Sequence, residues 1–260
     1  MSALEKIYKL KPDESQLLYS GLIEEQRIEV REWERYRWLQ LGGDSVQSLM
    51  DLNVTDQIIL PNIKALLSAF LFCPSPKRLL NLGLGAVSLE RYLNAKRPEI
   101  GITSVEPIEQ VIQLAKDYFF LPERVAVIQD TAEHFLSTHN DSYDIILCDI
   151  FAAEKQPDCL YDSSFYADVF KCLDMNGILA INLLPDSEQD VIDILVPMKN
   201  YFDNISLLEV PNHLNVIIFA SSQKLPSVDE LKNRANILLE QTDLDLRYIP
   251  ERINRLLETI

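Results

Sequence analysis

Short apolar runs alternate with amphipathic stretches of helical spacing through the middle of the chain, from Lys77 to about residue 184. The apolar runs predict strands near 78–83, 101–105, 124–129, 143–148 and 177–184. The stretches between them predict helices near 87–96, 107–119, 131–138 and 163–173. Repeated strand–helix units favour a parallel sheet with helices on both faces.

The pattern changes after this region. Residues 186–201 have the spacing of another helix, and two apolar runs, 205–211 and 214–222, lie close together around Pro211 and Asn212. Such a pair predicts an antiparallel hairpin at the far edge of the sheet. The expected fold is therefore α/β, with a Rossmann-like, mostly parallel seven-stranded sheet that ends in an antiparallel hairpin.

The first 72 residues predict a small N-terminal β region and a lead-in helix. Residues 27–41 alternate apolar and polar side chains with a shift of phase near Trp33, which indicates strand structure. Residues 42–45 resemble a hairpin turn that leads into a return strand at 46–50. Residues 56–72 predict an apolar-rich helix interrupted near Pro61, a residue that suits the first turn of a helix.

The end of the chain predicts a helical tail. Ser227 has the position of an N-cap, an apolar stripe at helical spacing follows it, and Pro250 is expected to open a last short helix that ends at Ile260. We therefore expect three parts: an N-terminal region at 1–72, a nucleoside-binding domain at 73–222 and a tail at 223–260.

Composition narrows the possible partners. The 260 residues are 47% hydrophobic, and 40 acidic against 24 basic side chains give a formal net charge of −16. Such a charge repels phosphate backbones, so nucleic acid is not an expected partner, whereas a cationic small molecule would be attracted. No apolar run reaches the roughly 18 residues of a membrane span, and the first residues do not resemble a signal peptide. A cytoplasmic protein without a membrane partner is therefore expected.

Glycines and acids follow the predicted strands at the edge where α/β sheets bind ligands. Gly83 and Gly85 follow the first strand and allow the backbone to turn tightly against a ligand. Glu106 follows the second strand, where a carboxylate can accept hydrogen bonds from both hydroxyls of a ribose. Asp130 and Asp149 end the next two strands. The four cysteines and three histidines have no metal-binding spacing, so no metal is expected.

Each of these positions also has a purely structural interpretation. The two glycines could form a plain strand-to-helix turn, and Asp130 could either accept from an adenine amino group or cap the helix that follows it. Asp149 could take a proton from an amine or only cap a loop. The long loop that follows, 150–162, could close over a substrate or be a surface connection. Because the third glycine of the dinucleotide fingerprint is replaced by Ser88, a nucleoside without a pyrophosphate fits the turn better.

Six segments, taken in order, resemble the spermidine synthase (polyamine aminopropyltransferase) family, which has the fold of class I S-adenosylmethionine-dependent enzymes. They are LQLGGDSVQS, CPSPKRLLNLGLG, VEPIEQVIQLAKDYF, VIQDTAEHF, YDIILCDIF and LYDSSFYADVFKCLDMNGILAINL. The order and spacing of the segments carry the resemblance, because no single one of them is diagnostic. It implies a transferase that takes S-adenosylmethionine or its decarboxylated form as co-substrate and a small amine as acceptor.

The resemblance also implies a role for each candidate residue. Asp149 would accept the proton of the amine. The residues implied in binding the nucleoside are Gln47, Gly83, Gly85, Glu106, Ile108, Asp130 and Thr131. Glu106 would hold the ribose, Asp130 and Thr131 the adenine edge, and Ile108 would lie against the adenine face. Family members usually form homodimers, so a homodimer is expected.

Four departures from the family pattern keep three hypotheses open. The Tyr-Gln or Tyr-His pair that lines the amine pocket in the family falls near Ile59 and Leu60, and no tyrosine stands near Pro211, where the family often supplies one. The acid that holds the donor's amine in the family is replaced by Ala86, and the second aspartate of the family's DSSD loop is replaced by Ala152.

The first hypothesis is aminopropyl transfer to an amine. The second is a methyltransferase, because Ala86 leaves no acid there to repel the carboxylate of intact S-adenosylmethionine, although Asn81 stands where methyltransferases commonly carry an acid. The third is an inactive binding or scaffold module.

Overall fold

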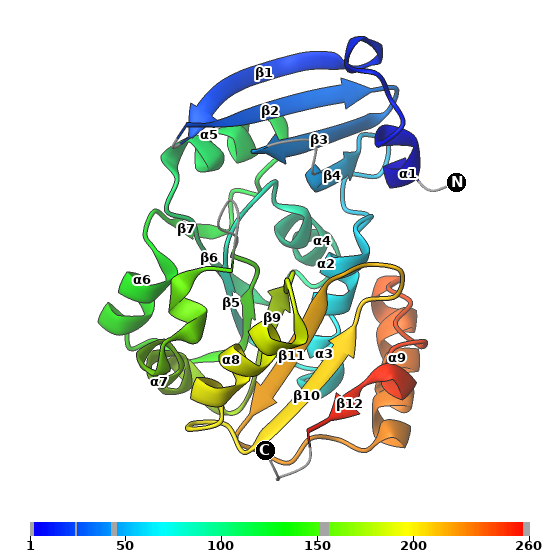
Figure 1. Ribbon diagram of the computed structural model, residues 1–260. Helices are drawn as coiled ribbons and strands as arrows, with labels where there is room; N and C mark the ends of the chain where they lie inside the picture. Colours follow the sequence, from blue (N-terminus) through cyan, green and yellow to red (C-terminus); the bar gives the residue numbers. More distant parts are fainter. Residues whose placement is uncertain (1–2, 24, 43–45, 151–155, 257–260) are drawn as a thin grey trace.

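The computed structural model describes residues 3–23, 25–42, 46–150 and 156–256. A small antiparallel sheet lies at one end of a larger α/β unit (Figure 1). The small sheet has the order β1-β2-β3-β4 and is preceded by α1 (Ala3–Ile7) and a short 3-10 helix (Pro12–Glu14). Its strands are β1 (Gln16–Ile23), β2 (Gln26–Trp33), β3 (Tyr36–Leu41) and β4 (Val46–Asp51).

Two corrections concern this sheet. The phase shift near Trp33 is a hairpin turn, in which Trp33 pairs with Tyr36 and Glu34 adopts a φ of 54°. The stretch 27–41 is therefore two strands, and β1 was not expected at all. The return strand is confirmed as β4, whereas residues 43–45 of the expected hairpin turn lie outside the described residues.

The lead-in helix is shorter than expected. Two short helices, α2 (Pro61–Leu66) and α3 (Ala69–Phe72), replace the helix expected over 56–72. Pro61 occupies the first helical position, where its missing N–H costs no hydrogen bond. The proline therefore begins a helix here and does not interrupt one.

The large sheet has the expected α/β topology. Its order is β12-β10-β11-β9-β8-β5-β6-β7. The parallel strands are β5 (Arg78–Leu82), β6 (Gly101–Val105), β7 (Ala126–Ile128), β8 (Tyr143–Cys148) and β9 (Leu173–Leu183). The expected antiparallel hairpin is formed by β10 (Asn204–Glu209) and β11 (Val216–Ser221). To these seven strands the tail adds β12 (Asn254–Arg255), which pairs with β10.

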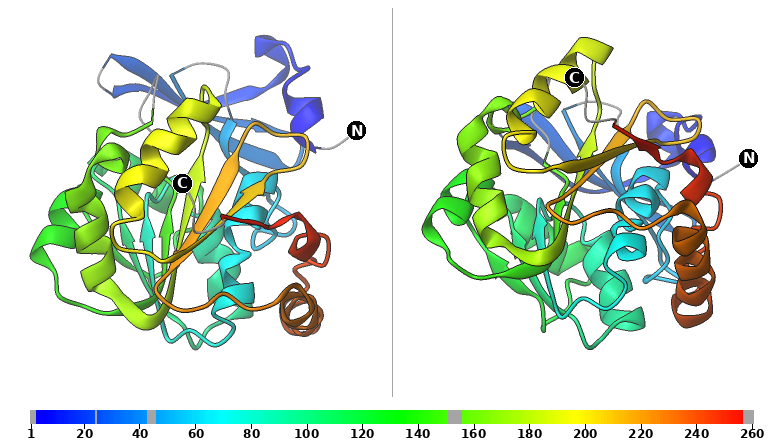
Figure 2. Two further views of the ribbon diagram at one scale, coloured as in Figure 1. Left: turned by 60° about the horizontal axis from the view of Figure 1, so that its bottom comes forward. Right: turned by 90° about the horizontal axis from the view of Figure 1, so that it is seen from below.

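Helices cover both faces of this sheet, as the views in Figures 1 and 2 show. Besides α2 and α3 they are α4 (Ser88–Lys96), α5 (Glu109–Tyr118), α6 (Ala132–Thr138), α7 (Ser163–Cys172), α8 (Glu188–Met198) and α9 (Val228–Thr242). Successive side chains along a strand point to opposite faces of the sheet. Leu79 and Leu147 pack in the cluster that contains α2, α3, α4 and α9, whereas Leu80 and Ile146 pack against α6, α7 and α8.

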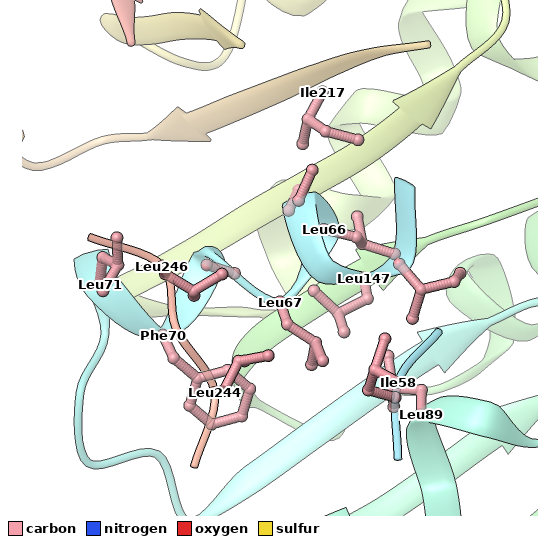
Figure 3. Packing of buried hydrophobic residues seen from close by; sticks show 14 of the residues in the cluster. Ile58, Leu66, Leu67, Phe70, Leu71, Leu89, Leu147, Ile217, Leu244 and Leu246 are labelled. Atoms are coloured by element: carbon pink, nitrogen blue, oxygen red, sulfur yellow. The ribbon is translucent and has the colours of Figure 1, made fainter. Parts of the chain in front are cut away.

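The segment after α9 closes the first of these clusters. Leu244 and Leu246 lie beside Phe70 and Leu67, and these side chains lie on the side of the sheet that carries Leu147 (Figure 3). Each such fully buried side chain contributes about 1.5–3 kcal/mol. The tail is therefore part of the core of the α/β unit.

The tail itself follows the expectation only in part. Ser227 caps α9, since its side chain accepts a hydrogen bond of 3.2 Å from the backbone N of Glu230. The last helix expected at Pro250 is a single 3-10 turn (Pro250–Arg252), after which the chain enters β12. Residues 257–260 of that expected helix lie outside the described residues. Within the part of the chain that is described, no helix combines the length and apolarity that crossing a membrane requires.

Candidate active site

The register of the parallel strands brings three strand ends to one edge. Leu82 at the end of β5 lies opposite both Val105 of β6 and Cys148 of β8. The three residues that follow these strand ends are Gly83, Glu106 and Asp149. Pairing continues one step further, because the backbone N of Gly83 donates to Val105 and that of Asp149 donates to Leu82. The edge expected to bind a ligand is therefore formed by these residues.

The turn after β5 needs glycine at both predicted positions. Gly83 has a φ of 96° and Gly85 a φ of 51°, a region that favours glycine. A Cβ atom on Gly83 would lie 2.4 Å from the carbonyl oxygen of Asp149, and one on Gly85 would lie 3.1 Å from Oγ of Ser48. The turn is thus packed directly against β8 on one side and β4 on the other.

Arg91 on α4 anchors this turn from behind. Its Nη1 donates to the carbonyl oxygens of Ala86, at 2.5 Å, and Phe119, at 2.8 Å, and its Nε donates to that of Thr55 at 2.7 Å. Burial lowers the pKa of Arg91 to about 10, so the group is still charged at neutral pH. One guanidinium therefore ties the glycine turn to the end of α5 and to the segment before α2.

Glu106 reaches the same turn from β6. Its Oε2 accepts a hydrogen bond of 3.2 Å from the backbone N of Leu84, and its Oε1 accepts one of 3.1 Å from that of Ile108. Burial raises the pKa of Glu106, while these backbone donors act in the opposite direction. The carboxyl group is thus held at the turn by two backbone donors.

Asp149 is held by a pair of asparagines that the sequence did not reveal as functional. Nδ2 of Asn182, on β9, donates to Oδ1 of Asp149 at 2.7 Å, and Nδ2 of Asn215 donates to Oδ1 of Asn182 at 3.0 Å. Although part of Asp149 is exposed, protein surrounds its carboxyl group, and this desolvation raises its pKa to about 6 against the effect of Asn182. In the sequence, the one sign of this role was that Asn182 is a polar residue within the apolar run that forms the end of β9.

A cavity of about 60 Å³ lies beside Asp149, several times the space that one water molecule needs. Four of the predicted residues line it, namely Gln47, Gly83, Gly85 and Asp149. The other residues around it come from β4, α2, β5, the glycine turn and the start of α4; they are Ser48, Ile63, Asn81, Leu84, Ser88, Leu89 and Glu90. The structure therefore brings the catalytic candidate, the glycine turn and the N-terminal sheet together.

The remaining predicted residues do not line this cavity. Thr131 caps α6, where its Oγ1 accepts from the backbone N of His134 at 3.2 Å. The cap suggested as the alternative role of Asp130 thus belongs to the next residue. Asp130 instead contacts Nδ1 of His134 at 2.7 Å, and this hydrogen bond lowers its pKa. Ile108 is partly buried and packs near the N-terminal sheet.

A buried polar cluster under the glycine turn was also missed. Glu90 on α4 is fully buried, and its Oε1 accepts hydrogen bonds of 2.7 Å from Nδ2 of Asn81 and from Oγ of Ser104. Asn81 also donates to the carbonyl oxygen of Gly83 at 2.6 Å. The sequence placed Glu90 on an amphipathic helix, where a glutamate is usually on the solvated face. Only the fold shows that it faces β5 and β6.

Metal ligation has no geometric basis among the residues that the structure describes. They contain no group of three or more histidine, cysteine, aspartate or glutamate side chains that could hold a metal ion. All four cysteines are free thiols, and three of them are buried.

The strand order, the terminal antiparallel hairpin and the glycine turn define a Rossmann-like fold of the spermidine synthase and methyltransferase type. A probable spermidine synthase from Corynebacterium glutamicum superposes with a TM-score of 0.75 at 20% identity, over 93% of this chain and 91% of that one. A spermidine synthase in complex with the transition-state analogue AdoDATO gives 0.63 at 17%, over 88% and 89%. Human methyltransferase-like protein 13 in complex with SAH gives 0.61 at 20%, over 70% and 89%.

Sequence relatives identify the family. A polyamine aminopropyltransferase from Neisseria meningitidis is 30% identical over 243 residues, which cover 91% of this chain and 89% of the relative. The polyamine aminopropyltransferase of Chromobacterium violaceum is 28% identical over 89% of this chain and 90% of that protein. No protein-family model matches the sequence. The chain belongs to the polyamine aminopropyltransferase family.

Proposed function

We propose that this protein is an aminopropyltransferase that takes the three-carbon amine tail of decarboxylated S-adenosylmethionine and transfers it to a small amine. The observation that supports this proposal most directly is the environment of the Asp149 carboxyl group. Its carboxyl group has a pKa of about 6, is oriented by Asn182, and lines a cavity directly beside the glycine turn. A general base is most effective when its pKa lies near the working pH.

The nucleoside half of the donor would lie along the edge formed by the strand ends. Glu106 has backbone donors on both oxygens, and a carboxylate retains further lone pairs for two ribose hydroxyls. The proposed adenine contacts are Asp130, Thr131 and Ile108. Gln47 would contact the ligand from the N-terminal sheet.

The proposed chemical step is a direct displacement. The nitrogen of the acceptor amine attacks the methylene carbon bonded to the sulfonium, a C–N bond forms, and the C–S bond breaks with its electron pair going to sulfur. Methylthioadenosine leaves as a neutral thioether, and Asp149 takes the proton that the amine loses. Because the sulfonium is already a good leaving group, positioning supplies most of the catalysis.

The charge around the cavity supports the decarboxylated donor over intact S-adenosylmethionine. Among the described residues that line it, Asp149 and Glu90 carry carboxyl groups and none is lysine, arginine or histidine. The carboxylate of the intact donor would find no basic partner there, whereas an ammonium would find acids. This argument favours aminopropyl transfer over the methyltransferase alternative.

Calorimetric titration tests the proposal. Decarboxylated S-adenosylmethionine and methylthioadenosine are expected to bind, and intact S-adenosylmethionine is expected to bind more weakly. Tighter binding of the intact form would favour a methyltransferase. Absence of heat with all three ligands would remove the nucleoside site and leave the scaffold hypothesis.

Three further expectations from the sequence are part of this proposal. They are a homodimer, a cytoplasmic location and the division of the chain at residues 72 and 222. Light scattering of the purified protein tests the first of them, and a monomeric mass would contradict it.

A further inference from the structure

Two residues that line the cavity each have a side-chain oxygen that accepts no hydrogen bond from the residues described here. These oxygens are Oε2 of Glu90 and Oδ1 of Asn81. Glu90 is fully buried and Asn81 is 3% exposed, and both residues line the same cavity as Asp149. A buried acceptor without a partner costs about 1–3 kcal/mol, and more when the group is charged. Two such atoms beside one cavity therefore call for a ligand that brings donors.

Their neighbours are already engaged. Nδ2 of Asn81 donates to Oε1 of Glu90 and to the carbonyl oxygen of Gly83, and Ser104 donates to the same Oε1. Arg91 is the nearest cation in sequence, and its Nη1 and Nε atoms donate to backbone carbonyls and not to Glu90. Within the described part of the chain, neither Oε2 of Glu90 nor Oδ1 of Asn81 receives a hydrogen bond.

We propose that Glu90 and Asn81 bind a primary ammonium group of the substrates under the glycine turn, an inference that rests on the proposed aminopropyl transfer. An ammonium has three donors, so it can satisfy both orphan oxygens and still have one hydrogen left. The ionised form of Glu90 would also neutralise its charge. Glu90 would in this way supply, four residues further along the chain, the carboxylate that Ala86 does not provide.

The burial of Glu90 and Asn81 explains why a cation would be bound favourably between them. Desolvation raises the pKa of Glu90, and the hydrogen bonds from Ser104 and Asn81, its own backbone N–H and the charge of Arg91 only partly offset this. An ammonium brought into the cavity favours the ionised form, because an opposite charge at close range stabilises a carboxylate. An intact amino-acid tail would add a second carboxylate next to Glu90 and would be disfavoured.

The ammonium has two possible sources, the tail of the donor and the acceptor amine, and one set of titrations separates them. The first compares decarboxylated S-adenosylmethionine with methylthioadenosine, which lacks the ammonium. The second adds a linear diamine to protein saturated with methylthioadenosine. Both are run on the wild type, Glu90→Gln and the exposed control Glu123→Gln.

If the donor tail is the ligand, Glu90→Gln lowers the affinity for decarboxylated S-adenosylmethionine about 10- to 100-fold, the value of a hydrogen bond to a charged group. Its affinity for methylthioadenosine stays within a factor of about three. If the acceptor is the ligand, the same loss appears in the diamine titration instead. Glu123→Gln leaves every affinity unchanged.

A purely structural role for Glu90 would weaken all ligands together, and that result would overturn the inference while leaving the proposed function intact. Binding of none of the ligands by the wild type would overturn both. Asn81→Ser provides a second variant in case Glu90→Gln does not fold. It is expected to lower the preference for the ammonium-bearing ligand by several-fold, and an unchanged preference contradicts the proposal.

Discussion

Replacing Asp149 with asparagine should make the protein more stable and far less active. The pKa of this carboxyl group rises from 3.8 to about 6 because folding removes it from water. A shift of about two units corresponds to about 3 kcal/mol, and partial exposure reduces this to about 1–3 kcal/mol. Asparagine keeps Oδ1 as the acceptor for Asn182 and carries no charge.

The sign of the stability effect depends on pH. Below pH 3.8 the carboxyl group is protonated in both states, so the folded protein has no penalty. As the pH rises from 3.8 to about 6, the unfolded state loses this proton while the folded state keeps it on a desolvated group, so stability falls across this range and is constant above it. Asp149→Asn should therefore gain about 1–3 kcal/mol in urea unfolding at pH 8 and nothing near pH 3.5.

Activity should change in the opposite direction. Loss of a general base typically costs a factor of about 10²–10⁴ in rate. The assay measures methylthioadenosine release from decarboxylated S-adenosylmethionine and an amine, with the exposed Asp203→Asn as matched control. A variant with wild-type activity, or an equal stability difference at both pH values, would refute the assignment of Asp149 as a desolvated base.

Three further predictions follow from the contacts around the turn. For the wild type, kcat/KM should fall as the pH drops below about 6. Asn182→Leu should move the midpoint of this fall to higher pH by about one unit, because Asp149 loses its hydrogen-bond donor. An unmoved midpoint in the pH–rate profile would contradict the role of the asparagine. Gly83→Ala should lower the free energy of unfolding by about 3 kcal/mol or more, because the new Cβ would lie 2.4 Å from the carbonyl oxygen of Asp149 and the backbone φ is 96°. A thermal midpoint equal to that of the wild type would show that the turn is not this tightly packed. Arg91→Met should lower the free energy of unfolding, measured in urea, by about 3 kcal/mol or more, since three carbonyl oxygens lose a charged donor. A decrease below about 1 kcal/mol would exclude the anchoring role.

The periodicity of the sequence was sufficient for the parallel part of the fold. Strands of the large sheet are apolar on both faces and are separated by amphipathic helices, so β5, β6 and β8 were placed to within a residue or so. The N-terminal sheet was harder. No residue of its first strand is buried, and the turn at Glu34 contains neither the glycine nor the asparagine that usually marks a hairpin.

The candidate site was predictable where it depends on strand ends. Gly83, Glu106 and Asp149 each follow a strand directly, so the topology alone brings them to one edge. Contacts between distant segments were not predictable from pattern. The hydrogen bond from Asn182 to Asp149 and the burial of Glu90 depend on the packing of particular strands and helices against one another, which periodicity does not encode.

The most direct measurement of the central claim is mass spectrometry of the products formed by the wild-type protein from decarboxylated S-adenosylmethionine and a panel of amines. We predict methylthioadenosine in equal amount to an amine that is heavier by one aminopropyl group, with neither product formed by Asp149→Asn at a comparable rate. Transfer of a methyl group instead, or the same product yield from both proteins, would contradict it.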